Sequence, residues 1–271
     1  MMPTPEDRAA YHRDGAVVVR NLLTDDEIDR LRTGVSVVMD DPSPLAVVGR
    51  ADGEPGVFFE DFCNWSRIPE FEHVIAGSAV AEVGAALMAS GSVRLFHDHV
   101  LVKSGGTSLP TPWHQDQPYY FVDGRQNVSF WIALDSVPMS ATLELLAGSH
   151  DGTWHQPRSF IEGTPMVFDE GTLAEVPDID TDLALDSGAH QILRWELSPG
   201  DAIAFHMLTL HRANGSADRR RAFSVRLFGD DARYAPRPHP TSPRFDDLGT
   251  LASGDPFDHP AFPVLWTADP G

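Results

Sequence analysis

A histidine and an aspartate two residues apart are the first side chains in this sequence that could do chemistry together. They lie in Trp113-His114-Gln115-Asp116. On extended backbone both side chains would leave the same face, so an imidazole and a carboxylate could bind one metal ion. The pair is a weak signal, because the chain has 12 histidines and His12 with Asp14 repeats the spacing at the end of a predicted helix. A third ligand is needed to make it informative.

His211 can supply that ligand, since it ends a run that begins at Gly200-Asp201. Two histidines and one carboxylate on one face of an octahedral ion leave three positions open, which is the arrangement of non-haem Fe(II) oxygenases. The open positions would accept a cosubstrate and dioxygen. The alternative is a histidine of the core or of a turn, and the spacing alone favours neither reading.

An arginine cluster, Arg219 to Arg221, and then Arg226 follow His211. A guanidinium beside a metal can bind a carboxylate through two parallel hydrogen bonds, which lysine cannot do. This chemistry suits a dicarboxylate cosubstrate. The alternative is an exposed basic turn on an acidic surface.

The order of several motifs resembles the phytanoyl-CoA dioxygenase-like family of Fe(II)/2-oxoglutarate oxygenases, and the match runs over most of the chain. The motifs are Tyr11 to Arg20, the His114 to Asp116 segment, Trp131, Gly148-Ser149-His150, Gly200-Asp201 before His211, and Arg220-Arg221-Ala222.

The resemblance implies a double-stranded β-helix that holds iron through His114, Asp116 and His211. It also implies that 2-oxoglutarate contacts Arg220, Trp131 and Lys103, the only lysine of the chain. The interval from His211 to the arginines is about two residues shorter than in the family, so Arg219, Arg221 and Arg226 remain alternatives for Arg220.

The implied activity is hydroxylation of a C–H bond of a small organic metabolite, with succinate and CO2 as coproducts. Asp116 is intact, whereas halogenating relatives have a small residue there; desaturation and cyclisation stay open. Two alternatives are a cupin-like metal enzyme that does not use 2-oxoglutarate and a jelly-roll binding protein without catalysis.

Aromatic and histidine side chains near the His114 to Asp116 segment are candidates for a substrate pocket: His99, Trp113, Tyr119 and Tyr120. Their alternative role is core packing. His97 and His99 form a rival metal pair, for which we favour a supporting or structural role.

The composition and charge of the chain limit the kinds of partner that it can bind. The chain has 271 residues, 42% of them hydrophobic, and a net charge of −20, so we expect a soluble single domain that repels nucleic acid and anionic membranes. A small metabolite suits this charge better than a CoA thioester. Cys63 is the only cysteine, and residues 1–15 have no apolar signal segment, so the simplest expectation is a cytoplasmic protein. The oligomeric state is left open.

The elements expected from the pattern are helices first and strands afterwards. Capping boxes at Thr4 and Thr24 predict two helices, with two more over residues 69–76 and 78–89, and a short strand at 16–20. Short β-rich runs follow from Val93 to Phe228. The predicted fold is therefore mainly β with flanking helices: a helical part (1–90), a jelly-roll core (91–230) and a tail (231–271) that wraps back. The acidic stretch between Arg158 and Arg194, including 162–189, is predicted to be a lid or insertion.

Overall fold

The computed structural model describes residues 2–159, 173–184, 191–216, 218–245 and 247–268. Within these ranges the helices are α1 (Pro5–Asp14), α2 (Asp25–Asp40), α3 (Pro69–Gly77), α4 (Val80–Met88) and α5 (Ile179–Ala184). The strands are β1 (Ala16–Val19), β2 (Val47–Gly49), β3 (Phe58–Phe62), β4 (Ser92–Lys103), β5 (Thr111–His114), β6 (Val122–Asp123), β7 (Asn127–Ala133), β8 (Leu143–Leu146), β9 (Ile192–Leu193), β10 (Ala202–Phe205), β11 (His211–Ala213), β12 (Arg220–Phe228), β13 (Arg233–Tyr234) and β14 (Val264–Thr267).

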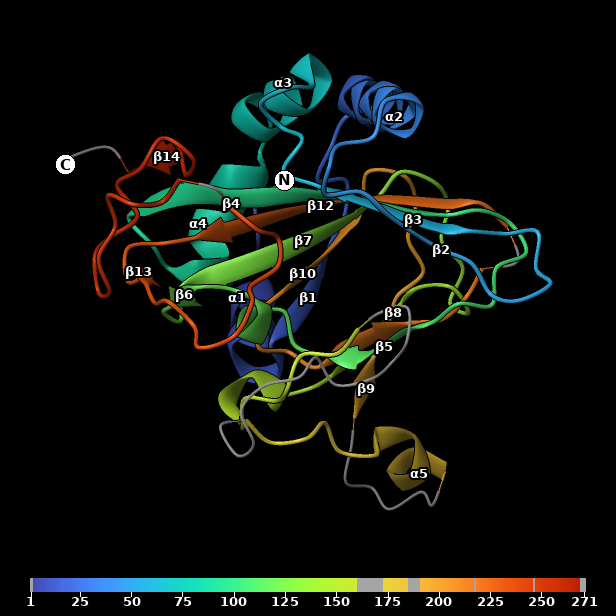
Figure 1. Cartoon of the computed structure of the whole chain (residues 1–271). Helices are drawn as coiled ribbons and strands as arrows, with labels where there is room; N and C mark the ends of the chain where they lie inside the picture. The colour runs from blue at the N-terminus through green and yellow to red at the C-terminus, as the bar shows by residue number, and fades with distance from the viewer. Residues whose placement is uncertain (1, 160–172, 185–190, 217, 246, 269–271) are drawn as a thin grey trace.

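Two antiparallel sheets form the framework. The larger has the order β1-β10-β7-β12-β4-β3-β2, with β14 also paired to β4, and the smaller has the order β5-β11-β8-β9. Figure 1 shows the smaller sheet below the larger one, while α2 and α3 lie on the larger sheet's opposite side. This is the mainly β, double-stranded β-helix architecture that the sequence predicts.

Side chains of the larger sheet alternate between its two faces. One face packs against the helices, and the other faces the smaller sheet. On β12, Phe223 and Val225 join the hydrophobic cluster formed with the helices. Arg220, Ser224 and Arg226 point the other way and line a cavity. Because side chains alternate between the two faces of a strand, every second side chain of β12 faces the interior between the sheets.

The N-terminal helix begins and ends where the sequence predicts. Thr4 and Asp7 form a reciprocal capping box, and Gly15 ends the helix with a φ of 79°. A Cβ at Gly15 would lie 2.5 Å from His150 Nδ1, so both the backbone conformation and the close packing favour glycine here.

Two local features differ from the sequence-based expectation. Strands β2 and β3 lie within the part predicted to be mainly helical, and β3 pairs with β4 in the larger sheet. The backbone is extended only as far as His114: Asp116 adopts helical angles (φ −74°, ψ −46°) at the start of a short 3-10 turn, Gln117–Tyr119. The aspartate therefore reaches the histidine from a turn and not along a strand face.

The C-terminal segment packs against the domain. Phe257 and Phe262 are buried in an aromatic cluster with Phe96 and Phe121, and β14 pairs with β4. Most of the predicted lid, residues 160–172 and 185–190, lies outside the described residues. Within the described ranges no single helix has the length and apolar character needed to cross a bilayer; α3 and α4, bent by 46°, meet that test only as a pair.

Candidate active site

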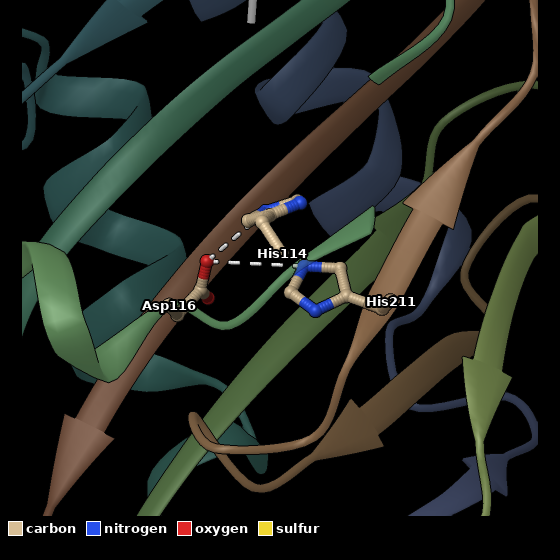
Figure 2. A group of neighbouring side chains, drawn as sticks. All are labelled: His114, Asp116 and His211. Carbon is tan, nitrogen blue, oxygen red and sulfur yellow. Dashed lines mark ion pairs between the residues drawn. The ribbon is translucent and has the colours of Figure 1, made fainter. Parts of the chain in front are cut away.

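The two histidines are brought together by strand pairing in the smaller sheet. His114 ends β5, His211 begins β11, and the two are directly opposed in the antiparallel register. Their ring centroids lie 4.1 Å apart. Figure 2 shows both rings turned toward Asp116, which follows β5 in the turn. One ligand atom from each of these three buried residues lies within 4.8 Å of the others.

Hydrogen bonds to the backbone orient both imidazoles. Nδ1 of His114 lies 2.8 Å from the carbonyl of Pro112, and Nδ1 of His211 lies 2.9 Å from the carbonyl of Thr209. A carbonyl only accepts, so each Nδ1 carries the proton and each Nε2 presents a lone pair. Burial lowers the pKa of His211 to about 3, which keeps this ring in the neutral form that binds metals.

The two oxygens of Asp116 have different surroundings. Oδ1 lies 3.6 Å from His114 Nε2 and 3.8 Å from His211 Nε2. Oδ2 accepts hydrogen bonds from Ser129 Oγ at 3.0 Å and from Arg226 Nε at 3.1 Å. Ser129 on β7 and Arg226 on β12 are directly opposed in the larger sheet. The larger sheet thus orients a carboxylate whose free oxygen faces the smaller sheet's histidines.

Charge keeps Asp116 ionised in this buried place. Burial alone would raise the pKa of the carboxyl, but the charge of Arg226 acts against burial, and the pKa lies well below its usual range. The result is a carboxylate and two imidazoles converging on one point. That donor set suits a divalent first-row transition metal with open coordination positions.

An inner cavity runs from the two histidines to Arg220. Its lining includes His114, His211, Trp131 and Arg220, with apolar walls from Leu101, Leu143 and Phe205. The Arg220 guanidinium lies 5.4 Å from the Trp131 ring centroid and donates to the carbonyl of Ala141. Burial lowers its pKa to about 10, and among the described residues no carboxylate is within ion-pair distance of it.

The neighbouring arginines have other surroundings. Arg219 is exposed, and Arg221, on the opposite face of β12, forms a two-pronged ion pair with Asp135 at 2.6 and 3.0 Å. Arg226 is bound to Asp116. Of the four arginines that the sequence left open, Arg220 alone is buried in the cavity with no acidic partner in the described structure.

Lys103 is opposed to Arg220 across β4 and β12. Its ammonium donates to the carbonyls of Leu109 at 2.7 Å and Asn214 at 2.9 Å, and burial followed by the nearby Arg220 lowers its pKa to about 7. Lys103 is not among the residues that line the inner cavity. It joins the loops that follow β4 and β11.

An outer cavity of about 260 Å³ has Asp116 in its lining, which the inner cavity does not. Three of the four predicted substrate-pocket residues line it, namely His99, Tyr119 and Tyr120, together with Glu60, Phe62 and Arg226. Trp113 lies elsewhere: its ring packs under Arg212 at 4.9 Å and lines a separate cavity beside α5. The strand pairing of β4 and β5 with different sheets separates Trp113 from His99.

Sequence reasoning missed Glu60 and did not assign Ser129 or the contact between Arg226 and Asp116. Glu60 lies in the aromatic run Phe58-Phe59-Glu60-Asp61-Phe62, where an acid surrounded by phenylalanines is a signal for a buried carboxyl. Ser129 carries no such signal, because only the pairing of β7 with β12 brings it to Asp116.

The fold and this site define a double-stranded β-helix protein with a His-Asp-His cluster between its sheets. Residues 11–222 match the phytanoyl-CoA dioxygenase (PhyH) family, and the chain belongs to that family. It is an enzyme of the 2-oxoglutarate-dependent non-haem iron oxygenases, which use iron, 2-oxoglutarate and dioxygen.

Individual relatives agree with this assignment. The ectoine dioxygenase of Stutzerimonas stutzeri (strain A1501) is 27% identical over 243 residues, which cover 83% of this chain and 77% of that protein. The 2-oxoglutarate-dependent carbocyclase SnoK from nogalamycin biosynthesis has a TM-score of 0.73 at 22% identity and 96% coverage of both chains. EctD from S. alaskensis, bound to 2-oxoglutarate and 5-hydroxyectoine, has a TM-score of 0.64 at 20% identity, covering 94% of this chain and 86% of that one. The structural likenesses establish the shared fold.

Proposed function

We propose that this protein hydroxylates a C–H bond of a small organic metabolite, with His114, Asp116 and His211 as the iron ligands and Arg220 as the residue that binds the far carboxylate of 2-oxoglutarate. The observation that carries the proposal is the inner cavity, which joins both histidines to a buried arginine without an acidic partner among the described residues. Iron with 2-oxoglutarate and dioxygen supplies the oxidation of the C–H bond, with succinate and CO2 as coproducts.

Arg220 suits a dicarboxylate for an energetic reason. A buried guanidinium without a counter-charge is unfavourable, and an incoming carboxylate offsets that cost while making a two-pronged contact. Trp131 packs against the guanidinium and limits its movement. The apolar walls formed by Leu143 and Phe205 exclude water, which strengthens the ion pair.

The contacts of Lys103 support a positioning role. Its ammonium already satisfies two backbone carbonyls, one of which belongs to Asn214, three residues beyond His211. We propose that Lys103 holds this loop in place. The loop leads into β12, the strand that begins at Arg220, so Lys103 also helps to position Arg220.

The experiment that tests the proposal is an anaerobic titration of the Fe(II) protein with 2-oxoglutarate, followed by its weak visible charge-transfer band. We expect the band in wild type, its loss in His211→Ala, and in Arg220→Ala a dissociation constant for 2-oxoglutarate raised at least tenfold. Arg219→Ala is the matched control, because it removes an exposed arginine one residue away. Wild type that binds iron without developing the band would refute the use of 2-oxoglutarate.

Hydroxylation itself is tested on products. Once a metabolite accelerates succinate formation, turnover under ¹⁸O2 should add one labelled oxygen atom to it. If succinate forms together with an unlabelled product that is two hydrogens lighter than the substrate, the reaction is desaturation or cyclisation and not hydroxylation.

A further inference from the structure

Glu60 is a buried carboxyl that faces the outer cavity and that the iron and 2-oxoglutarate chemistry does not use. Its side chain is 5% exposed and lines the cavity together with Phe62, Tyr119 and Tyr120. The only ion pair that the described structure gives it is with His99, whose Nε2 lies 3.2 Å from Oε1. A carboxyl in such an apolar wall is costly unless something hydrogen-bonds to it.

The protonation of His99 follows from its other neighbour. Nδ1 of His99 lies 3.4 Å from a terminal nitrogen of Arg226, and a guanidinium can only donate. Nδ1 is therefore the accepting nitrogen, and Nε2 carries the proton, which lies near Glu60 but makes no hydrogen bond among the described residues. Stacking of the ring on Phe62, with centroids 3.9 Å apart, holds this orientation.

His99 lies 3.2 Å from Oε1 of Glu60 without making a hydrogen bond, so this buried oxygen has no hydrogen-bond partner among the described residues. No hydrogen bond to the second oxygen, Oε2, occurs among the described residues, and Oε2 is not among the buried polar atoms left without a partner. An oxygen that lacks a protein partner and is not sealed in the interior is open to the cavity that Glu60 lines. We infer that Glu60 binds a hydrogen-bond-donating group of the substrate, an ammonium or a hydroxyl, and thereby selects the substrate class.

The inference rests on the proposed function and narrows its substrate. A bound donor favours the ionised form of Glu60, which accepts hydrogen bonds only, whereas an anionic group beside that carboxylate would bring two negative charges together. An anion would have to bind instead at Arg158 or Arg226, which also line the cavity. A fatty acyl chain would leave Glu60 without a donor. The fitting substrate is compact, with an aliphatic body against Phe62, Tyr119 and Tyr120 and an amine or hydroxyl at the Glu60 end.

The position of Glu60 relative to the ligands makes this contact useful for orientation. Glu60 contacts His99, His99 contacts Arg226, and Arg226 holds Asp116. A donor group bound at Glu60 is therefore held by the same polar chain that orients the metal-binding carboxylate. Its distance from the reacting position is set by packed side chains and not by a loop.

The test uses three probes of one shape: cyclohexylammonium, cyclohexanol and cyclohexanecarboxylate. Binding is measured by calorimetry, with the metal-free protein and with the anaerobic Fe(II)/2-oxoglutarate protein. We expect wild type to bind the ammonium and the alcohol at least tenfold more tightly than the carboxylate. Glu60→Gln should weaken binding of the ammonium at least tenfold while leaving 2-oxoglutarate binding unchanged. Glu72→Gln, which changes an exposed acid on α3, controls for the loss of one negative charge.

The inference is overturned if Glu60→Gln binds the ammonium as wild type does, or if wild type favours the carboxylate or binds none of the probes. Selective binding of the donors by a protein that shows no 2-oxoglutarate band would reject the proposed oxygenase function and leave the donor site standing. A protein that develops the 2-oxoglutarate band but does not prefer the ammonium and the alcohol would reject the donor site and leave the oxygenase function standing. The two failures are therefore distinguishable.

Discussion

Replacing Glu60 by Gln should stabilise the protein, and the gain should grow with pH. Burial raises the pKa of this carboxyl from 4.5 to about 7, although Lys103 and Arg226 act in the opposite direction. The folded protein therefore binds a proton at Glu60 that the unfolded chain has lost between pH 4.5 and 7. The stability that depends on this proton is fully present below pH 4.5 and is lost as the pH rises through 7.

The magnitude follows from the two pKa values. Integrating the linkage from pH 5.5 to pH 8.5 gives a loss of about 2 kcal/mol that is specific to Glu60, and most of it occurs below pH 7.5. Glutamine has nearly the same shape and does not ionise. The free energy of unfolding of Glu60→Gln minus that of wild type should therefore be about 2 kcal/mol larger at pH 8.5 than at pH 5.5.

The assay is urea unfolding of the metal-free protein at both pH values, followed by tryptophan fluorescence. The lower pH stays above the pI near 4.8, where a protein without net charge precipitates easily. Comparing the two proteins at each pH cancels the titration of every other group. A pH-independent difference would refute the buried, protonated state of Glu60, and a difference that shrinks with pH would mean that a cation stabilises the carboxylate.

Three further outcomes are expected. Ser129→Ala removes one of the two hydrogen-bond donors to Asp116 Oδ2. The affinity for iron, measured by competition with a chelator, should therefore fall roughly tenfold. An unchanged affinity would show that Arg226 alone is enough to orient Asp116. Lys103→Met leaves two carbonyls without their donor and should cost about 2–3 kcal/mol in urea unfolding with little change in the 2-oxoglutarate dissociation constant; a large rise in that constant would make Lys103 a cosubstrate contact. Gly15→Ala forces a Cβ onto a φ of 79° and against His150 and should lower stability by at least about 2 kcal/mol, and a neutral result would contradict the close packing of this turn.

Much of the framework could be predicted because local rules and tertiary packing agree there. The capping boxes at Thr4 and Thr24 satisfy amide groups within one turn, so the starts of α1 and α2 follow from a few residues. Strand β3 was not predicted because acids interrupt its aromatic run. Glu60 and Asp61 are both buried in the structure, and they contact His99 and Ser43 from other segments, which no local pattern contains.

Some residues of the candidate site could likewise be identified from the sequence, and others could not. Residue type and spacing suggested His114, Asp116 and His211, and the family resemblance selected them; the structure brings the three together within 4.8 Å. Residue type and spacing could not separate Arg220 from its neighbours, because that distinction depends on which face of β12 points to the interior. Trp113 was predicted beside the substrate from its place in the chain, but side chains adjacent in sequence on a strand point to opposite faces.

The order of the strands places the proposed substrate contact and the proposed cosubstrate contact in different parts of the larger sheet. The larger sheet holds Asp116 from β7 and β12 and presents Arg220 from β12, in its middle. Glu60 lies on β3, beyond β4 and next to the edge strand β2. We expect a substitution on β3 to change what the outer cavity accepts without moving β7 or β12, because β4 lies between them. The proposed substrate contact near the sheet edge is thus separated from the proposed cosubstrate contact at its centre, while His99 on β4 and Arg226 on β12 line both cavities.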